Sequence, residues 1–336
     1  MSQFDFIKDI ARYGLENDQE QLLDVLNRLI EYSRKTKKVN FALQMQSILK
    51  EGLRAQQTKG LAKVGSQKYY LREDDREINE LIIEKLTSDY SFDNLVCSSD
   101  VREELEFFVK EHHGIEVLNK FELPVSNKIL FYGPSGCGKT LASYVLAGEL
   151  EKMMYVINLG AIVSSKLGET SKNLAKIFRR ATSEDCIIFL DEFDSLGKIR
   201  DYSQDHGEMK RVVNTILQLF DYLPQKSIVI AATNQLQMID EALLRRFDVK
   251  MKLDIPNKIQ IRQLISKTLD NTPFKIKEKK ALTEIVNYSV GLSYFIIQRT
   301  LITAIKRTLF SSDSINPDFS VDTIIWKKLL SHHKNA

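Results

Sequence analysis

The sequence predicts an α/β fold whose core is a parallel sheet with helices on both faces. Between residues 128 and 253, apolar runs of strand length alternate with segments of helical periodicity. This alternation is typical of strands that are buried on both faces and connected by helices. Outside that stretch the apolar residues repeat only at helical spacing. The expected strands are KILFY (128–132), MYVINL (154–159), CIIFL (186–190), SIVIAA (227–232) and VKMKL (249–253).

The same patterns divide the chain into four parts. Residues 1–56 carry three apolar stripes at helical spacing, and they predict either a small helical docking domain or a helical extension packed on the main domain. Residues 57–90 are polar and charged, so we expect a linker followed by one helix. Residues 91–255 contain the predicted sheet as the large α/β domain. Residues 256–336 show four helical segments, which predict a C-terminal helical domain.

Composition and charge exclude several classes of protein. The chain has 336 residues and a net charge of +3, a balance that argues against a nucleic-acid or membrane-surface partner. No apolar run approaches the length of a membrane span, and the acidic, amphipathic N-terminus is unlike a signal peptide. Cys97, Cys137 and Cys186 are far apart and lack the spacing of a zinc site or a disulfide framework. We therefore expect a cytoplasmic protein.

A glycine-rich stretch, GPSGCGKT, follows the first expected strand and precedes a helical segment. That context is the one a P-loop requires, because its glycines let backbone amides turn inward around phosphates. Lys139 would reach the outer phosphates, and Thr140 would offer its hydroxyl to Mg²⁺. The predicted nucleotide-binding residues of the loop are Gly133, Pro134, Ser135, Gly136, Cys137, Gly138, Lys139 and Thr140.

An acidic pair, Asp191 and Glu192, follows the apolar run CIIFL. In parallel sheets ligands bind at the carboxyl ends of strands, where this pair would lie. Asp191 would bind both the nucleotide and Mg²⁺, partly through water, and Glu192 would polarise the attacking water. A helix N-terminus also attracts acidic residues, but the position of the pair behind a P-loop favours hydrolysis. Asp194 is interpreted as a cap or a supporting residue.

Two further motifs point to the γ-phosphate. The strand SIVIAA leads to Asn234, which would hold the attacking water, although an asparagine is also common in turns after strands. Arg245 and Arg246 stand together in ALLRRFD. They would either form a surface ion pair or act as arginine fingers that stabilise the transition state in a neighbouring subunit.

In this order and spacing, the P-loop, LDE, ATN and LRRFD motifs resemble those of AAA+ ATPases of the AAA clade, over roughly residues 91–336. The resemblance implies ATP and Mg²⁺ bound between subunits of a homo-oligomeric ring, usually hexameric, with the C-terminal helices as a lid. It assigns Asp191 and Glu192 to Walker B, Asn234 to sensor 1, and Arg245 and Arg246 to the trans fingers. It also suggests Asn158 as a restraint on Glu192, and residues near 93–95 and 291–293 around the adenine.

Two departures from the family pattern bear on function. The pore-loop position has Lys166, Leu167 and Gly168 where an aromatic residue is usual, so threading of a polypeptide is in doubt. In the lid, Ile296 replaces an acidic residue, and Arg299 is interpreted as facing solvent.

The sequence therefore predicts an ATP-hydrolysing ring that remodels or gates a protein partner or substrate. The overall pattern resembles bacterial stand-alone AAA ATPases, some of which are thought to act with a separately encoded, protease-like partner. It includes the short helical N-terminus and the stretches KLGETSKNL, DEFDSLGK and HGEMKRVVNTILQLFD. The alternative is an ATP-dependent assembly switch or regulatory binding module that does not thread. A nucleic-acid motor is the least favoured interpretation.

Overall fold

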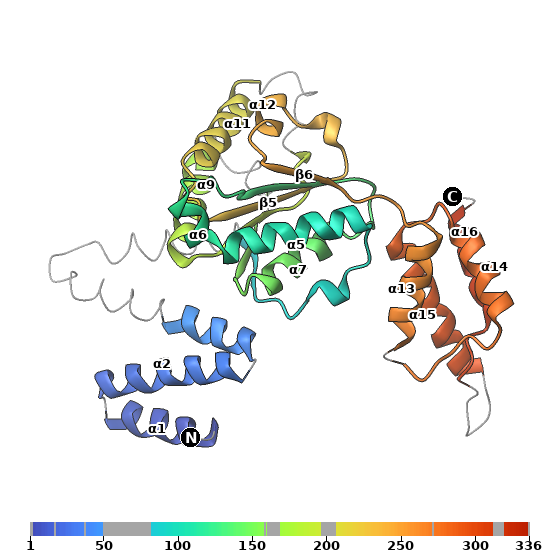
Figure 1. Ribbon diagram of the computed structural model, residues 1–336, viewed down its shortest axis with the longest axis horizontal. Coiled ribbons are helices and arrows are strands. Elements are labelled where there is room, and N and C mark those ends of the chain that lie inside the picture. The colour runs from blue at the N-terminus through green and yellow to red at the C-terminus, as the bar shows by residue number, and fades with distance from the viewer. Residues whose placement is uncertain are drawn as a thin grey trace.

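A computed structural model of the chain is shown in Figure 1. It describes residues 3–16, 18–36, 38–49, 82–157, 159, 169–195, 206–270, 272–311 and 319–334. None of the helices within these ranges is both long enough and apolar enough to cross a lipid bilayer.

A six-stranded sheet in the order β1-β3-β4-β5-β2-β6 forms the centre of the molecule. All its neighbouring strands run parallel except β1, which is antiparallel to β3. The five strands expected from the sequence are confirmed to within two residues at each end. The strands are β1 (Ile82–Leu86), β2 (Lys128–Tyr132), β3 (Met154–Ile157), β4 (Ile187–Leu190), β5 (Ile228–Thr233) and β6 (Val249–Lys252).

Strand β1 was not expected from the sequence, which placed a linker and a helix in residues 57–90; of that stretch the structure describes only residues 82–90, so the helix itself stays a prediction. The strand has the sequence IIEKL, in which glutamate, lysine and leucine favour a helix over a strand. Backbone pairing with β3 overrides that preference, because β1 closes the edge of the sheet. Charged side chains are common on such edge strands, where they discourage pairing with other chains.

Helices cover both faces of the sheet, as predicted. On one face, α5 (Ser99–His113) and α7 (Lys139–Glu149) pack on Ile129, Phe131 and Phe189. On the other, α9 (Glu169–Glu184) and α11 (His206–Asp221) pack on the alternate residues, such as Leu130 and Ile188. Shorter elements are η1 (Phe92–Asn94), α6 (Ile115–Lys120), η3 (Leu236–Met238) and α12 (Glu241–Leu244).

Four helices after the sheet share a separate hydrophobic cluster, as the sequence predicts, and we call them the lid. Trp326 is fully buried in this cluster, and its indole Nε1 donates a hydrogen bond to Thr300 Oγ1 at 3.1 Å. The lid helices are α13 (Lys258–Asp270), α14 (Lys279–Ser289), α15 (Tyr294–Ser311) and α16 (Thr323–Lys334).

The N-terminal region is helical, in agreement with the sequence. It contains α1 (Gln3–Glu16), α2 (Gln19–Lys35) and a further helix over residues 39–49. The first two pack together through Phe6, Val25 and Leu29. The domain boundaries at 56, 90 and 255 stay predictions.

A buried carboxylate ties β1 to the rest of the sheet. The side chain of Glu184, at the end of α9, is almost fully buried and accepts hydrogen bonds from Tyr155, from Lys85 Nζ at 3.1 Å and from Arg180 Nε at 3.2 Å. Burial alone would raise the pKa of Glu184, but the hydrogen bonds from Tyr155 and Lys85 outweigh it and lower the pKa. Burial and the bond to Glu184 raise the pKa of Tyr155.

The substitution Glu184→Gln is expected to lower the free energy of unfolding by about 3 kcal/mol at neutral pH, since it leaves Lys85 and Arg180 without their buried counter-charge. Because the folded-state pKa of Glu184 is lowered, its stabilising effect is complete above about pH 4.3 and is lost as the pH falls below that value. Urea unfolding at neutral and acidic pH should therefore show a smaller acid loss in the variant than in the parent. An identical pH dependence in the two chains would contradict this role.

Candidate functional site

The loop Gly133–Thr140 connects β2 to α7, and its glycines adopt conformations that other residues rarely adopt. Gly133, Gly136 and Gly138 have φ angles of 139°, 72° and 90°. A Cβ on Gly133 would lie 2.1 Å from the carbonyl oxygen of Leu253, and one on Gly136 would lie 2.8 Å from Ser293 Oγ. The loop can therefore take this shape only with glycine at these positions.

The N-terminus of α7 is suited to an anion. Gly138 caps the helix and provides no side-chain hydrogen bond, so the first amides of the helix point out of the loop without a capping group. These amides and the helix dipole together favour a phosphate at that position. The arrangement fits the triphosphate of a nucleotide.

Lys139 is the first residue of α7, and its ammonium group lies over the loop. Its Nζ donates hydrogen bonds to the carbonyl oxygens of Gly133 and Pro134, each at 2.8 Å. Burial lowers the pKa of Lys139, while the nearby carboxylates of Asp191 and Asp194 act in the opposite direction. The loop thus holds a buried cation beside the helix N-terminus.

The loop and the acidic pair are brought together, as the sequence predicts. Thr140 Oγ1 donates a hydrogen bond to Asp191 Oδ2 at 3.2 Å. The second carboxylate oxygen of Asp191 accepts the backbone N–H of Glu192 at 2.9 Å. A hydroxyl and a carboxylate in direct contact form a pair of oxygen ligands of the kind that Mg²⁺ prefers.

Glu192 lies in the turn after β4 and has an exposed side chain. Its φ angle of 49° is in the left-handed region, which is unfavourable for a residue with a Cβ. Backbone hydrogen bonds hold the turn on both sides, from Phe193 N to Ala232 O and from Ser195 N to Glu192 O, each at 2.8 Å. Strain of this kind is concentrated at functional positions.

Asp194 joins this turn to the end of β5. Its carboxylate is buried and accepts hydrogen bonds from Thr233 Oγ1 at 2.9 Å and from the backbone N–H of Asn234 at 3.4 Å. The sequence predicted a supporting role for Asp194 but did not identify Thr233 as its partner. The bond positions Asn234, whose side chain is exposed, next to the turn that carries Glu192.

The two arginines are not brought to the loop of the same chain. Arg245 and Arg246 follow α12, whose Leu243 packs in the cluster on the α9–α11 face, while α7 covers the opposite face (Figure 1). Arg246 forms a two-point ion pair with Asp221, with Nε–Oδ1 at 2.6 Å and Nη2–Oδ2 at 3.1 Å. Among the residues that the structure describes, Arg245 pairs with Glu241 alone, one turn earlier, at 3.0 Å, and its side chain is 75% exposed.

The lid touches the loop directly. The backbone N–H of Phe295, in the first turn of α15, donates a hydrogen bond to the carbonyl oxygen of Gly136 at 3.1 Å. Arg299 is exposed and lies with Cζ 5.8 Å from the ring centre of Phe295, which agrees with its predicted position at the surface. Lys267 of α13 also donates to the carbonyl oxygen of Asp93 in η1.

A cavity of about 380 Å³ lies beside the loop, between the large domain and the lid. It is lined by Val96, Cys97 and Cys137 on one side and by Tyr294 of the lid on another. These positions adjoin residues 93–95 and 291–293, which were expected around the adenine. Burial raises the pKa of the Cys97 and Cys137 thiols, so both stay protonated at neutral pH. A protonated thiol is a poor nucleophile, so Cys137 is not a candidate nucleophile. Asn158, Lys166, Leu167 and Gly168 lie outside the described residues.

Comparison with known proteins agrees with this geometry. The model of the family "ATPase family associated with various cellular activities (AAA)" matches residues 129–255. An uncharacterized AAA family ATPase of Sinorhizobium fredii is 35% identical over 226 residues, which cover 67% of each chain.

More distant relatives are longer than the region they share with this chain. A putative 26S proteasome regulatory subunit homolog of Methanocaldococcus jannaschii is 30% identical over 217 residues, 62% of this chain and 56% of the relative. An ATP-dependent zinc metalloprotease of Sphaerobacter thermophilus is 28% identical over 208 residues, 60% of this chain and 32% of the relative. Taken with the loop, the acidic pair and the mixed sheet, these matches show that the chain belongs to the AAA family and is an ATPase.

Proposed function

We propose that the chain hydrolyses ATP at a site completed by a neighbouring copy, in a ring that is expected to be hexameric, and that it remodels or gates a protein partner. The observation that carries this proposal is the contact of Thr140 with Asp191 beside the uncapped N-terminus of α7. A hydroxyl, a carboxylate and a buried ammonium therefore lie near the helix N-terminus that we propose as the phosphate site. The base that hydrolysis requires, Glu192, is the next residue.

Each residue of the site has a proposed role. The loop residues 133–140 bind the phosphates through backbone amides, and Lys139 neutralises their charge. Thr140 and Asp191 would hold Mg²⁺, which supplies positive charge to the phosphate oxygens when it is bound. Glu192 accepts a proton from the attacking water, and Asn234 orients that water.

A protein partner is supported by the names of two relatives. One is a putative proteasome regulatory subunit homolog and the other an ATP-dependent metalloprotease, and both names connect an AAA domain to proteolysis. A separately encoded protease, in the cytoplasm, is therefore a fitting partner for this chain.

The second candidate is an ATP-dependent assembly switch without threading. Lys166 at the pore-loop position favours it, because lysine grips an apolar chain poorly.

Replacing Glu192 by glutamine is expected to lower the hydrolysis rate by about 10²-fold or more, because the amide cannot accept the proton of water. ATP binding should stay within about threefold of the parent, since the loop and Asp191 are untouched. Steady-state hydrolysis and equilibrium binding of a fluorescent ATP analogue measure the two effects. Glu278→Gln, at an exposed helix end in the lid, is the matched control and should match the parent in both assays.

The parent rate per chain should also rise with chain concentration and reach a plateau, because a site shared between chains is complete only in the assembly. A constant rate down to concentrations at which the chain is monomeric would contradict a shared site. Loss of ATP binding together with hydrolysis in Glu192→Gln would contradict the assignment of the base.

Of the two arginines, we expect Arg245 to enter the neighbouring site. Its exposed ion pair with Glu241, one turn away on the same helix, is worth only about 0.3–0.5 kcal/mol, so it can change partner at little cost. Arg246 would have to leave a two-point pair with Asp221. Arg245→Ala should lower the rate about 10³-fold or more, and Arg246→Ala should have a smaller effect through the position of Arg245.

Mixing Arg245→Ala chains with Glu192→Gln chains tests whether the arginine acts between copies. Each variant alone is nearly inactive, but a site with an intact Glu192 can receive Arg245 from a neighbouring Glu192→Gln chain. Hydrolysis should therefore recover in the mixture at constant total protein. A mixture that stays at the average of the two separate rates would contradict action between copies.

A further inference from the structure

The segment between β1 and α5 lies along α7, the helix that begins at the nucleotide loop. We call residues 87–95, which include η1, the strap. At the C-terminal end of α7, a Cβ on Gly148 would lie 2.0 Å from the carbonyl oxygen of Tyr90, so only glycine lets the strap approach this closely. The ring of Tyr90 also stacks on that of Tyr144, with the ring centres 6.3 Å apart. The strap is therefore packed tightly against this end of the helix.

The other end of the strap lies at the N-terminus of α7. The position that a Cβ on Gly138 would take is 4.0 Å from Leu95 Cδ1, and Leu95 is buried in the same hydrophobic cluster as Cys137. Between the two ends, the backbone N–H of Phe92 donates a hydrogen bond to Glu149 Oε1 at 2.6 Å. The strap thus extends from the last turn of α7 to the loop that we propose binds the phosphates.

The strap is also bonded to the lid. Lys267 of α13 donates a hydrogen bond to the carbonyl oxygen of Asp93. This bond is made to an ordered turn, because Ser91 and Asn94 form a capping box around η1. The position of η1 and the position of the lid are therefore linked.

The N-terminal helices contact the first residues of the strap. In the helix over residues 39–49, Asn40 Nδ2 donates a hydrogen bond to Asp89 Oδ1, and Gln44 Nε2 donates one to Thr87 Oγ1 at 3.2 Å. Asn40 and Gln44 are one turn apart on the same side of their helix. Both hydrogen bonds are exposed, so water competes with them and they contribute little net stability. The contact can therefore open while the rest of the fold is kept.

We propose that the strap lets the N-terminal helices control how tightly the chain holds nucleotide. When Asn40 and Gln44 are bonded to the strap, it stays against α7, Leu95 supports the loop and Asp93 holds the lid. When the helices leave, the strap loosens and nucleotide is released faster. This inference rests on the proposed nucleotide site and adds a means of regulation to it. The coupling is reciprocal, so bound nucleotide also strengthens the contact between the helices and the strap.

Exchanging two bonded residues tests the contact at the start of the strap. In the full chain with magnesium present, Asn40→Asp places a second carboxylate beside Asp89 and should raise the Kd of a fluorescent ATP analogue by about fivefold or more. Combining Asn40→Asp with Asp89→Asn restores an amide opposite a carboxylate, and this variant should bind like the parent. Asn27→Asp, at an exposed position of α2, makes the same change away from the strap and should also bind like the parent.

Hydrogen exchange provides a readout that does not depend on activity. In the parent, saturating nucleotide should slow exchange of the amides in residues 39–49, since nucleotide and the contact favour each other. Asn40→Asp should abolish this slowing, and the exchanged pair should restore it. A contact that only attached the N-terminal helices would give the same exchange with and without nucleotide.

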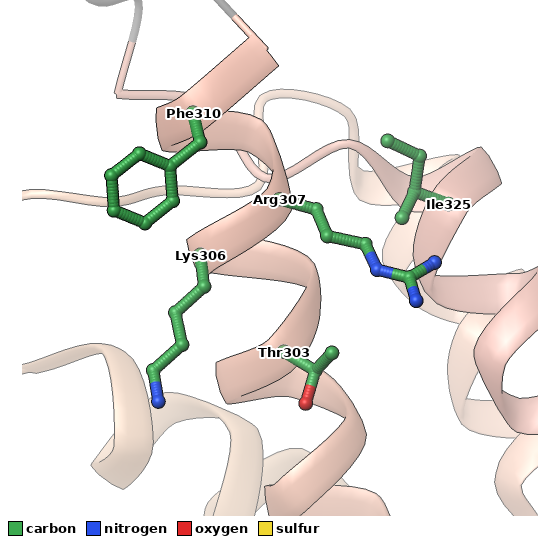
Figure 2. Close-up of a pocket in the computed structure, with 5 residues that line it drawn as sticks. All are labelled: Thr303, Lys306, Arg307, Phe310 and Ile325. Carbon is green, nitrogen blue, oxygen red and sulfur yellow. The ribbon is translucent and has the colours of Figure 1, made fainter.

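A variant at the lid end tests whether the strap acts as one unit. Lys267→Ala removes the bond to Asp93 and should also weaken nucleotide binding. Together with Asn40→Asp its effect should be less than additive, because both changes loosen the same segment. The matched control is Lys306→Ala, which should bind like the parent. Figure 2 shows Lys306 extending from α15 at a shallow groove of the lid that no residue of the strap lines.

The outcomes separate this inference from the proposed function. A parent that does not bind the analogue overturns the nucleotide site itself. If the parent binds and Asn40→Asp binds equally well, the inference is wrong and the site stands. Weaker binding that the exchanged pair does not restore, or effects at the two ends that add in full, also overturns it. Thermal unfolding checks each variant, and if Asn40→Asp has lost its fold, Gln44→Ala replaces it and should weaken nucleotide binding in the same way.

Discussion

The hydrogen bond between Thr140 and Asp191 is the contact on which the rest of the site depends. It joins residues 51 positions apart, one at the start of α7 and the other after β4. The strands that lead to them, β2 and β4, are not neighbours, because β5 lies between them. The contact therefore exists only when three parallel strands are paired in this order. Asn234 follows the middle strand of the three, β5, so the same order brings it close to the loop and the acidic pair. The proposed site therefore requires this order of strands in the sheet.

The loop between β2 and α7 connects this chemistry to the lid. Gly136 has no Cβ, and the space that a Cβ would occupy is taken by Ser293 and Phe295 at the start of α15. The same glycine accepts the backbone hydrogen bond of Phe295. Any change in the loop on nucleotide binding would therefore reach the first turn of α15. A rigid helix of 18 residues is a suitable element to carry such a change to the far side of the lid.

Most of the sheet and the lid could be predicted from local sequence, and the edge strand could not. The four inner strands, β2 to β5, are largely continuous apolar runs, so burial and secondary structure coincide in them. Strand β1 depends on pairing with β3 and on the bonds of Lys85 to Glu184, about 100 residues away. The site shows the same division. Its motif residues could be predicted because the residue types and their spacing in the sequence indicate the chemistry. The hydrogen bond of Asp194 with Thr233 and the ion pair of Arg246 with Asp221 could not, because they join segments that are far apart in the sequence.

The position of the two arginines explains why one chain is not a complete enzyme under the proposed function. Leu243 fixes α12 to the α9–α11 face of the sheet, so Arg245 cannot turn toward the loop without unpacking a buried residue. Its side chain is strongly exposed, and its local ion pair is weak enough to be exchanged at little cost. Both features are explained if the partner is a phosphate on an adjoining copy. The geometry then makes assembly a condition of catalysis, because each chain holds the nucleotide with one edge and completes its neighbour's site with another.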